Sequence, residues 1–245
     1  NNYPNSINID DAHTYLAELL MSTKNYKDAL KSIENIKIKT EKINEAWQKV
    51  AYFRAIELFN DKRFDEALPL FKKAASMRYN NNFAALGLFW AGEIYYRLNK
   101  NDSALNYYQS FLTAPGAFNQ PEYNLTHYNI GYCYFKDKKY SQALLSFQKF
   151  LLSQENKNTE LINDAYKRIA DCYFINKDIN NALSYYDKSI STKLSGIDYS
   201  LFQKAIALGI LKRFTEKEAV LNQLLTEYPN SNYVDDALFE LADTY

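Results

Sequence analysis

The sequence repeats itself every 35 to 39 residues along almost its whole length. A small residue marks each copy and is called the anchor of that repeat. The seven anchors are Ala17, Ala55, Gly92, Gly131, Ala170, Ala205 and Ala242. A chain with this period folds as a stack of similar supersecondary units, each of which packs on its neighbours, rather than around one central core.

Three further positions follow each of the first six anchors at constant distances. Nine residues after the anchor stand Tyr26, Phe64, Asn101, Tyr140, Ile179 and Phe214. Twelve residues after it stand Ala29, Ala67, Ala104, Ala143, Ala182 and Lys217. Sixteen residues after it stand Ile33, Phe71, Tyr108, Phe147, Tyr186 and Leu221. All variation in length therefore lies between the repeats, and each repeat is one structural unit.

The residue pattern of each repeat predicts two short amphipathic helices joined by a tight turn. Around the fifth anchor, apolar residues recur at helical spacing, as at Tyr166, Ile169 and Tyr173. A polar turn such as 136–139 follows the first helix, and a second apolar face begins after it. The anchor and the residue twelve positions later are small enough to let the two helices cross closely. The large residues at the other two positions fill the space around that crossing.

This pattern resembles the signature of the tetratricopeptide repeat family over essentially the whole chain. The fourth repeat matches most clearly, at Gly131, Tyr134, Tyr140, Ala143 and Phe147. The resemblance implies an all-α fold, a right-handed α-solenoid of about six helical hairpins with the start of a seventh first helix. The predicted units are 10–41, 47–79, 84–116, 123–155, 162–194 and 198–229, with a partial unit at 234–245.

The repeats depart from the family pattern in their length and at one core position. The family's period is about 34 residues, so these repeats carry extra residues between the second helix and the next repeat. Lys217 replaces the crossing Ala in the sixth repeat, and we expect Ala219 to take its place through a shifted helix. The chain begins at Asn1 and stops inside the apolar segment 241–245, so we expect a piece of a longer protein.

The composition argues against several classes of function. Lys and Arg total 29, as do Asp and Glu, and this zero net charge argues against nucleic acid as the main partner. Two Cys exclude a four-Cys zinc site, and two His leave little for metal or general-base chemistry. No apolar run approaches the length of a membrane span. We therefore expect no cofactor, no metal, and no membrane insertion within this segment.

The few reactive residues are explained better by packing than by catalysis. His13 and His127 occupy equivalent positions, and neither has a carboxylate or Cys at ligand spacing. Cys133 and Cys172 are also equivalent, and no base stands at a recognisable position beside them, so we expect small buried hydrophobes. The chain has no Gly-rich phosphate loop and no His-Glu-x-x-His motif. The sequence predicts a protein that is not an enzyme.

The resemblance also implies where a partner would bind. In this family the first helix of each hairpin lines the concave face. Partners touch the positions three before and one, four and five after the small residue. Here those positions hold aromatic residues edged by basic ones, and the family's carboxylate clamp is absent. The predicted groove consists of Tyr52, Phe59, Phe89, Tyr96, Arg97, Tyr128, Tyr132, Phe135, Lys136, Lys167 and Phe174.

We therefore expect a scaffold that binds a partner protein or peptide in this aromatic groove. One alternative is a glycan- or peptidoglycan-binding module of a bacterial envelope or secretion system, which exposed Tyr rings flanked by Asn, Asp or Arg would favour. A second alternative is a structural spacer within a longer array, which a groove filled by its own side chains would favour.

The compartment of the protein follows only from resemblance. The phrase Tyr-Pro-Asn-Ser at 3–6 and 228–231 is similar to repeat proteins of the bacterial envelope, and the richness in Asn, Lys and Tyr is similar to chains from the Bacteroidetes. These features favour the periplasm or the outer membrane, whereas two unpaired Cys are also compatible with the cytoplasm.

Overall fold

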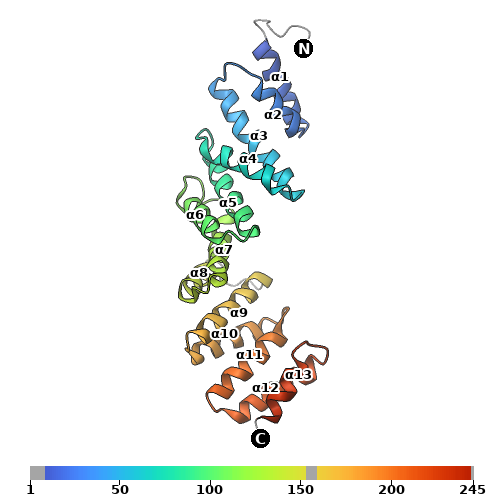
Figure 1. Ribbon diagram of the computed structural model, residues 1–245, viewed down its shortest axis with the longest axis vertical. Helices are drawn as coiled ribbons and strands as arrows, with labels where there is room; N and C mark the ends of the chain where they lie inside the picture. Colours follow the sequence, from blue (N-terminus) through green and yellow to red (C-terminus); the bar gives the residue numbers. More distant parts are fainter. Residues whose placement is uncertain (1–8, 153–158, 244–245) are drawn as a thin grey trace. The chain divides into compact units, whose positions relative to one another are not determined.

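The computed structural model describes residues 9–152 and 159–243, and every regular element in these ranges is an α-helix (Figure 1). The chain divides into two compact halves, Asn1–Thr126 and His127–Tyr245. The first half contains α1 (Ile9–Ser22), α2 (Tyr26–Glu34), α3 (Glu41–Asn60), α4 (Phe64–Ser76), α5 (Asn81–Arg97) and α6 (Asn101–Thr113). The boundary falls inside α7 (Glu122–Lys136). The second half continues with α8 (Tyr140–Leu152), α9 (Glu160–Ile175), α10 (Ile179–Ser191), α11 (Ile197–Ile210), α12 (Phe214–Glu227) and α13 (Val234–Ala242).

Each half is a stack of helical hairpins. In the N-terminal half, α1 packs on α2, α3 on α4 and α5 on α6, and the hairpins meet where α2 packs on α3 and α4 on α5. In the C-terminal half, α9 pairs with α10 and α11 with α12, while α8 packs on α9 and α13 on α12. The Tyr132 ring of α7 lies 5.3 Å from the Phe147 ring of α8, centroid to centroid. The predicted all-α repeat solenoid is confirmed.

The turn inside the hairpin has one geometry that recurs six times. The residue nine after the anchor is the first residue of the second helix in all six cases. Two residues before it the backbone is left-handed, at Lys24, Lys62, Asn99, Lys138, Lys177 and Lys212. In repeat four, for example, the Lys139 N–H donates to the Tyr134 carbonyl and the Lys138 N–H donates to the Phe135 carbonyl. This arrangement satisfies carbonyls that the end of the first helix would otherwise leave without partners.

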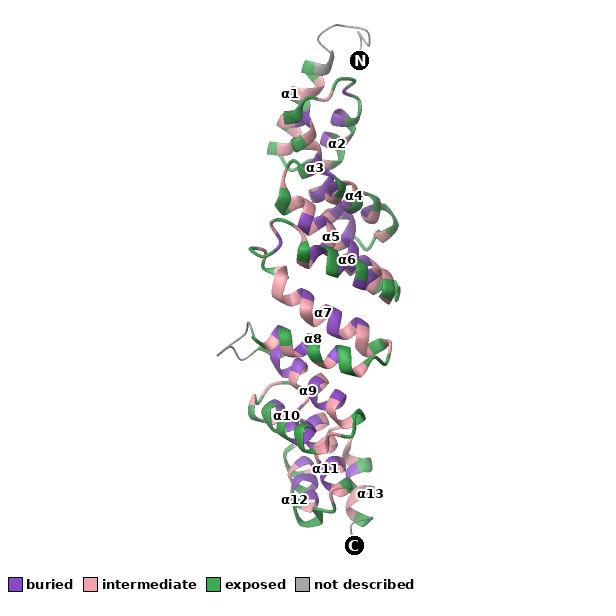
Figure 2. Ribbon diagram, turned by 90° about the vertical axis from the view of Figure 1, so that its left-hand side faces the viewer, coloured by how far each residue is buried: buried purple, intermediate pink, exposed green. Residues whose placement is uncertain are grey.

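The positions that define the repeat form the interior. The first six anchors and the residues twelve and sixteen positions after them are all buried. A Cβ added at Gly131 would lie 2.7 Å from the Phe147 ring, and one at Gly92 would lie 2.8 Å from the Tyr108 ring. The large residue at position sixteen therefore lies directly on the anchor of its own hairpin. Along each helix, buried residues alternate with exposed ones, as amphipathic packing requires (Figure 2).

The sixth repeat corrects the prediction for Ala219. Ala219 is exposed, whereas Lys217 itself is buried with 4 % of its surface accessible. The Lys217 stem lies against Gly209, the residue four after the anchor, where most other repeats carry an aromatic side chain. The Lys217 ammonium forms an ion pair with Glu240 of α13 at 2.6 Å. Because Gly209 leaves room and Glu240 supplies a countercharge, the helix keeps its register.

A buried glutamine fixes the loop that leaves the second repeat. Gln48, seven residues before its anchor, is fully buried on α3. Its Nε2 donates to the carbonyls of Ala74, Met77 and Asn80 at 2.8 to 3.0 Å, and its Oε1 accepts from the Asn80 N–H at 2.7 Å. One side chain thereby supplies partners for backbone groups in the last turn of α4 and in the loop before α5.

The same position performs the same task in two repeats of the C-terminal half. Asn163, also fully buried, donates to the Ser195 carbonyl at 2.8 Å and accepts from the Ser189 hydroxyl at 2.7 Å. Asp198 accepts from the Ser231 hydroxyl at 2.5 Å. In each case a polar residue in the first helix holds the loop that follows the second helix of its own hairpin.

Candidate functional site

The predicted groove residues of the N-terminal half do not form an open band of aromatic rings. Phe89 is 2 % exposed, because its ring packs against Tyr108 and Phe111 of α6 with centroids 5.9 and 5.5 Å apart. Burying an aromatic side chain stabilises the hairpin. The expectation that Phe89 faces a groove is therefore wrong. Tyr52 is buried as well, with 8 % of its surface accessible.

Phe59 and Arg97 are brought together on α3 and α5. The Arg97 guanidinium lies 4.8 Å from the centre of the Phe59 ring, and Trp90 packs edge-on against the same ring at 4.9 Å. Glu93 lies 3.9 Å from Arg97 Nε. Arg97 therefore covers Phe59, of which only 8 % is exposed, while Tyr96 beside it is half-buried. A partner would meet the guanidinium before it met the ring.

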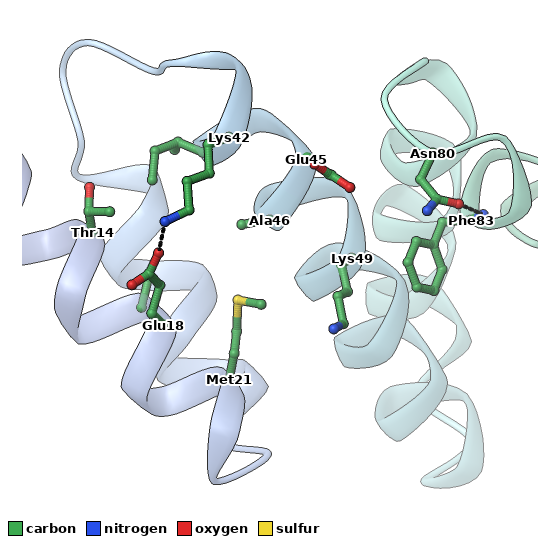
Figure 3. A pocket seen from close by; sticks show the side chains of 11 residues that line it. Thr14, Glu18, Met21, Lys42, Glu45, Ala46, Lys49, Asn80 and Phe83 are labelled. Carbon is green, nitrogen blue, oxygen red and sulfur yellow. Dashed lines mark hydrogen bonds and ion pairs between the residues drawn. The ribbon is translucent and has the colours of Figure 1, made fainter.

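A cavity of about 330 Å³ opens between the first helices of the three N-terminal hairpins. Figure 3 shows Thr14, Glu18 and Met21 on one side, residues of α3 such as Ala46 and Lys49 in the middle, and Asn80 and Phe83 opposite. The complete lining is Thr14, Ala17, Glu18, Met21, Lys42, Ile43, Glu45, Ala46, Lys49, Asn80 and Phe83. Thr14, Glu18 and Met21 stand three before and one and four after the first anchor, so they hold the positions at which the family binds partners.

The cavity combines an apolar interior with a charged rim. Met21, Ala46 and Phe83 supply apolar surface and are only partly buried. At the rim, Lys42 Nζ and Glu18 Oε1 form an ion pair at 2.5 Å, drawn as a dashed line in Figure 3. This pair is largely exposed and leaves the cavity open to solvent. An apolar interior with a few polar groups around it is the chemistry typical of ligand-binding cavities.

In the C-terminal half, the inner tyrosines contact acidic residues of the next hairpin. Tyr128 Oη of α7 donates to Asp164 Oδ2 of α9 at 2.8 Å, and Tyr132 Oη donates to the same oxygen. The two rings pack edge-to-face with centroids 5.0 Å apart. Burial together with the Asp164 carboxylate raises the pKa of both hydroxyls, so both remain donors at neutral pH.

Arg168 connects this pair of tyrosines to the following hairpin. Its Nη1 donates to Asp171 Oδ2 at 2.8 Å, and its Nε lies 3.6 Å from Asp164 Oδ1. Asp171 Oδ1 in turn accepts from Tyr186 of α10 at 2.9 Å and from Tyr199 of α11 at 2.7 Å. The resulting polar network, called the Arg168 network, consists of Tyr128, Tyr132, Asp164, Arg168, Asp171, Tyr186 and Tyr199.

The Arg168 network is held by opposing electrostatic effects. Burial raises the pKa of Asp171, while the Arg168 guanidinium and the two tyrosine hydroxyls act against that rise. Burial alone would lower the pKa of Arg168, but Asp171 and the other acidic neighbours outweigh it and raise the value. Arg168 therefore stays charged between two carboxylates. Both tyrosine pairs of the network donate to these carboxylates, so Asp164 and Asp171 are engaged within the protein.

The remaining predicted residues of this half lie apart from one another. Phe135 is half-buried, and the Arg168 guanidinium lies 5.7 Å from the centre of its ring. Phe174 packs against the core between α9 and the last hairpin, whereas Lys136 is exposed at the end of α7. Lys167 is 9 % exposed and its Nζ donates to the Ser195 carbonyl at 3.3 Å. Lys167 thus serves the loop before α11 and does not edge a groove, contrary to expectation.

Sequence reasoning missed Asp164, Arg168 and Tyr199. These residues stand six or two positions before their anchors, outside the positions carried over from the family. A usable signal was present at other positions. Glu93 and Asp171 stand one after the anchor, and their hairpins carry Tyr108 and Tyr186 at position sixteen. The Tyr108 hydroxyl donates to Glu93 at 2.5 Å just as Tyr186 donates to Asp171.

The structure contains little that favours catalysis in its described residues. Cys133 and Cys172 are fully buried and form no disulfide with each other, and burial raises the pKa of the Cys172 thiol to about 12. Over residues 9–152 and 159–243, no group of three or more His, Cys, Asp or Glu side chains could hold a metal ion. Within the same ranges, no helix is long and apolar enough to cross a membrane.

The stacked hairpins and the residues on their first helices define an α-helical repeat protein. The profile described as tetratricopeptide repeat matches residues 52–119 and 91–160, and a second profile with the same description matches 164–194. The chain belongs to the tetratricopeptide repeat family. Proteins of this family are typically non-enzymatic scaffolds, and membership supports a general role in protein interaction. No curated protein matches the chain.

Solved structures show the same fold at low sequence identity. MamA is 19% identical with a TM-score of 0.58, and the match covers 70% of this chain and 92% of MamA. Pseudomonas aeruginosa pilF is 18% identical with a TM-score of 0.54 and 96% of each chain covered. The apo form of RapI is 16% identical with a TM-score of 0.62, covering 84% of this chain and 60% of RapI. At these identities the likeness concerns the fold.

Proposed function

We propose that the chain is a non-enzymatic scaffold that binds a peptide segment of a partner protein in the cavity between α1, α3 and α5. The observation that carries this proposal is the cavity itself, about 330 Å³ with apolar walls and a charged rim. It lies on the first helices of consecutive hairpins, the surface through which this family commonly binds partners. An apolar side chain of the peptide fills the cavity, and the rim charges fix the direction of the backbone.

The predicted aromatic groove takes a narrower form in this proposal. Arg97 and the edge of Phe59 extend the binding surface along α5, while Phe89 and Tyr52 support it from within. Met21, Ala46 and Phe83 supply the apolar contact with the partner in place of the buried Phe89 and Tyr52.

The C-terminal half supports a second candidate function, that of a structural spacer. Its inner tyrosines donate to Asp164 and Asp171, which leaves their hydroxyls without a free donor for a ligand. A surface filled by its own side chains transmits position along the array without binding. The glycan-binding alternative gains nothing from these rings, because Tyr128 and Tyr132 pack edge-to-face on one another instead of presenting flat faces.

Selection from a displayed library of random peptides tests the proposal. Peptides that bind the folded chain are expected to share an apolar residue. The variant Ala46→Glu, which introduces a carboxylate into the cavity, is expected to weaken their binding by at least about tenfold in calorimetry. The control Leu145→Glu changes an exposed apolar residue on α8 and is expected to leave binding unchanged.

Two outcomes would contradict peptide binding in the cavity. Selected peptides that bind both variants equally would place the site elsewhere. A library that yields no binder, together with binding of soluble peptidoglycan fragments, would favour the glycan-binding module. Circular dichroism must show that both variants are folded like the parent chain.

A further inference from the structure

A second surface of the N-terminal half has a different chemistry from the cavity. It surrounds a hollow of about 640 Å³ between the start of α3, the end of α4 and the loop before α5. We call it the Trp47 surface; it is lined by Glu41, Asn44, Trp47, Lys73, Ser76, Met77, Arg78 and Tyr79. None of these residues lines the cavity between α1, α3 and α5.

Trp47 and nearby lysines form the centre of this surface. Lys73 Nζ lies 4.0 Å from the centre of the Trp47 ring, and Lys39 Nζ lies 5.1 Å from it. Trp47 is only partly buried, so part of its indole remains accessible beside the ammonium groups. Such contacts orient a lysine without neutralising its charge. Beyond the helix end, Arg78 and Tyr79 are both exposed.

The buried Gln48 side chain holds the loop that carries Arg78 and Tyr79. The buried Gln48 side chain donates to the Met77 and Asn80 carbonyls on either side of these two residues and accepts from the Asn80 N–H. A loop fixed in this way loses little conformational entropy on binding. The Gln48 contacts therefore present Arg78 and Tyr79 in a prepared position.

The charges of the Trp47 surface are not balanced. Lys73 and Arg78 have no ion-pair partner among residues 9–152 and 159–243, and Glu41 is the one acidic residue of the lining. Lys73 stands in the last turn of α4, where the helix dipole alone would favour a cation. That effect does not account for Arg78 or for the aromatic rings beside it.

The combination is particular to the second repeat. The position of Trp47, eight before the anchor, is held by Ala84, Tyr123, Ile162 and Ile197 in the repeats that follow. The packing of the fold therefore does not require a tryptophan there. A chain with zero net charge nevertheless places Lys73 and Lys39 beside this one ring and Arg78 in the same hollow.

We propose that the Trp47 surface binds an acidic peptide segment of a partner protein. Carboxylates of the peptide pair with Lys73 and Arg78, and an apolar side chain between them lies against Trp47 and Tyr79. A polyanion such as nucleic acid would need a broader basic surface and would meet Glu41. The Trp47 surface is separate from the cavity. Variants of each site therefore distinguish a failure of this proposal from a failure of the proposed function.

The test uses the synthetic peptide Glu-Glu-Phe-Glu-Glu and an analogue in which every Glu is replaced by Gln. The acidic peptide is expected to bind with one-to-one stoichiometry in calorimetry and to change the tryptophan fluorescence, and Trp47→Phe removes the change. The double variant Lys73→Gln, Arg78→Gln is expected to weaken binding at least about tenfold. The matched control Lys27→Gln, Lys100→Gln removes the same charge from exposed sites of the same half and is expected to retain binding.

Three results would overturn the proposal. Equal weakening in the double variant and in its control would show attraction by overall charge alone. Equal binding of the Gln analogue would remove the role of the carboxylates. Tight binding of tripolyphosphate without binding of the acidic peptide would assign the surface to phosphate ligands.

Discussion

The two halves of the chain use the same hairpin and treat their inner faces in opposite ways. The N-terminal half leaves a cavity of about 330 Å³, with an exposed Lys42–Glu18 pair at its rim. The C-terminal half fills the equivalent face with the Arg168 network. The core positions of both halves are largely alike, so the difference arises from a few polar positions, most of them on the first helices. Repeat packing determines the scaffold, and these positions determine whether a face can receive a partner.

Removal of Arg168 should give the largest difference in stability between a variant of the C-terminal half and its counterpart in the N-terminal half. Arg168→Met leaves Asp164 and Asp171 without their buried countercharge and is expected to lower the free energy of unfolding by about 3 kcal/mol. The matched substitution Lys42→Met breaks an exposed pair and is expected to leave stability nearly unchanged. Urea denaturation monitored by circular dichroism measures both. A similar effect of the two variants would mean that the network is not more important to stability than a surface pair.

A single hydroxyl of the network should have an intermediate effect. Tyr132→Phe removes one of the two donors to Asp164 and is expected to cost about 1 to 2 kcal/mol in the free energy of unfolding. Tyr95→Phe in the N-terminal half removes a hydroxyl that accepts from the exposed Lys72, and little change is expected. Equal costs in urea denaturation would argue that the hydroxyls of Tyr132 and Tyr95 are equivalent.

The hairpin turn should respond alike in both halves. Lys62 and Lys138 have φ of 60° and 59°, a region that glycine adopts without steric cost. Lys62→Gly and Lys138→Gly are each expected to raise the free energy of unfolding by about 0.5 to 1 kcal/mol, because relief of the left-handed strain exceeds the added entropy of the unfolded chain. Thermal denaturation provides the measurement. Stabilisation in only one half would mean that the two turns are not equivalent.

The smallest effect concerns pH. Burial, assisted by Lys149, lowers the pKa of His127 in the folded state. The resulting stability is present above the unfolded value of about 6.5 and is lost as pH falls through the lowered folded value. The free energy of unfolding is therefore expected to fall between neutral and mildly acidic pH, and less so in His127→Gln. His13→Gln changes the equivalent position in the N-terminal half and is the variant for comparison. An unchanged pH dependence in His127→Gln would contradict this account.

The sequence was sufficient for the fold because the repeat signal comes from buried packing. The anchors and the residues twelve and sixteen positions later are buried in all six hairpins, and the residue at nine begins every second helix. Lys217 shows the limit of this reasoning. Its burial depends on Gly209 of its own hairpin and on Glu240 of the next helix, and a pattern within one repeat does not contain the contact with Glu240.

The binding surface was less accessible to sequence reasoning. Spacing places Phe89 and Tyr96 on one helix, but the rotation of a ring toward the core or the surface depends on which neighbours leave space. Asp164 and Arg168 were missed because they contact Tyr128, Phe135 and Tyr199 of other hairpins, which fixed offsets within one repeat do not describe. Lys167 was misplaced because its terminal amine can turn toward a loop carbonyl as readily as toward solvent.

The polar residue seven positions before the anchor has a consequence for how such a chain can change length. Gln48, Asn163 and Asp198 each bond to the loop that leaves their own hairpin. Both partners of the contact therefore lie within one stretch of sequence, and a duplication that copies one hairpin with its loop copies the contact intact. Each such hairpin contains the contact that fixes the direction in which the chain leaves it. An array can therefore grow or shrink by whole repeats without changes in the remaining ones.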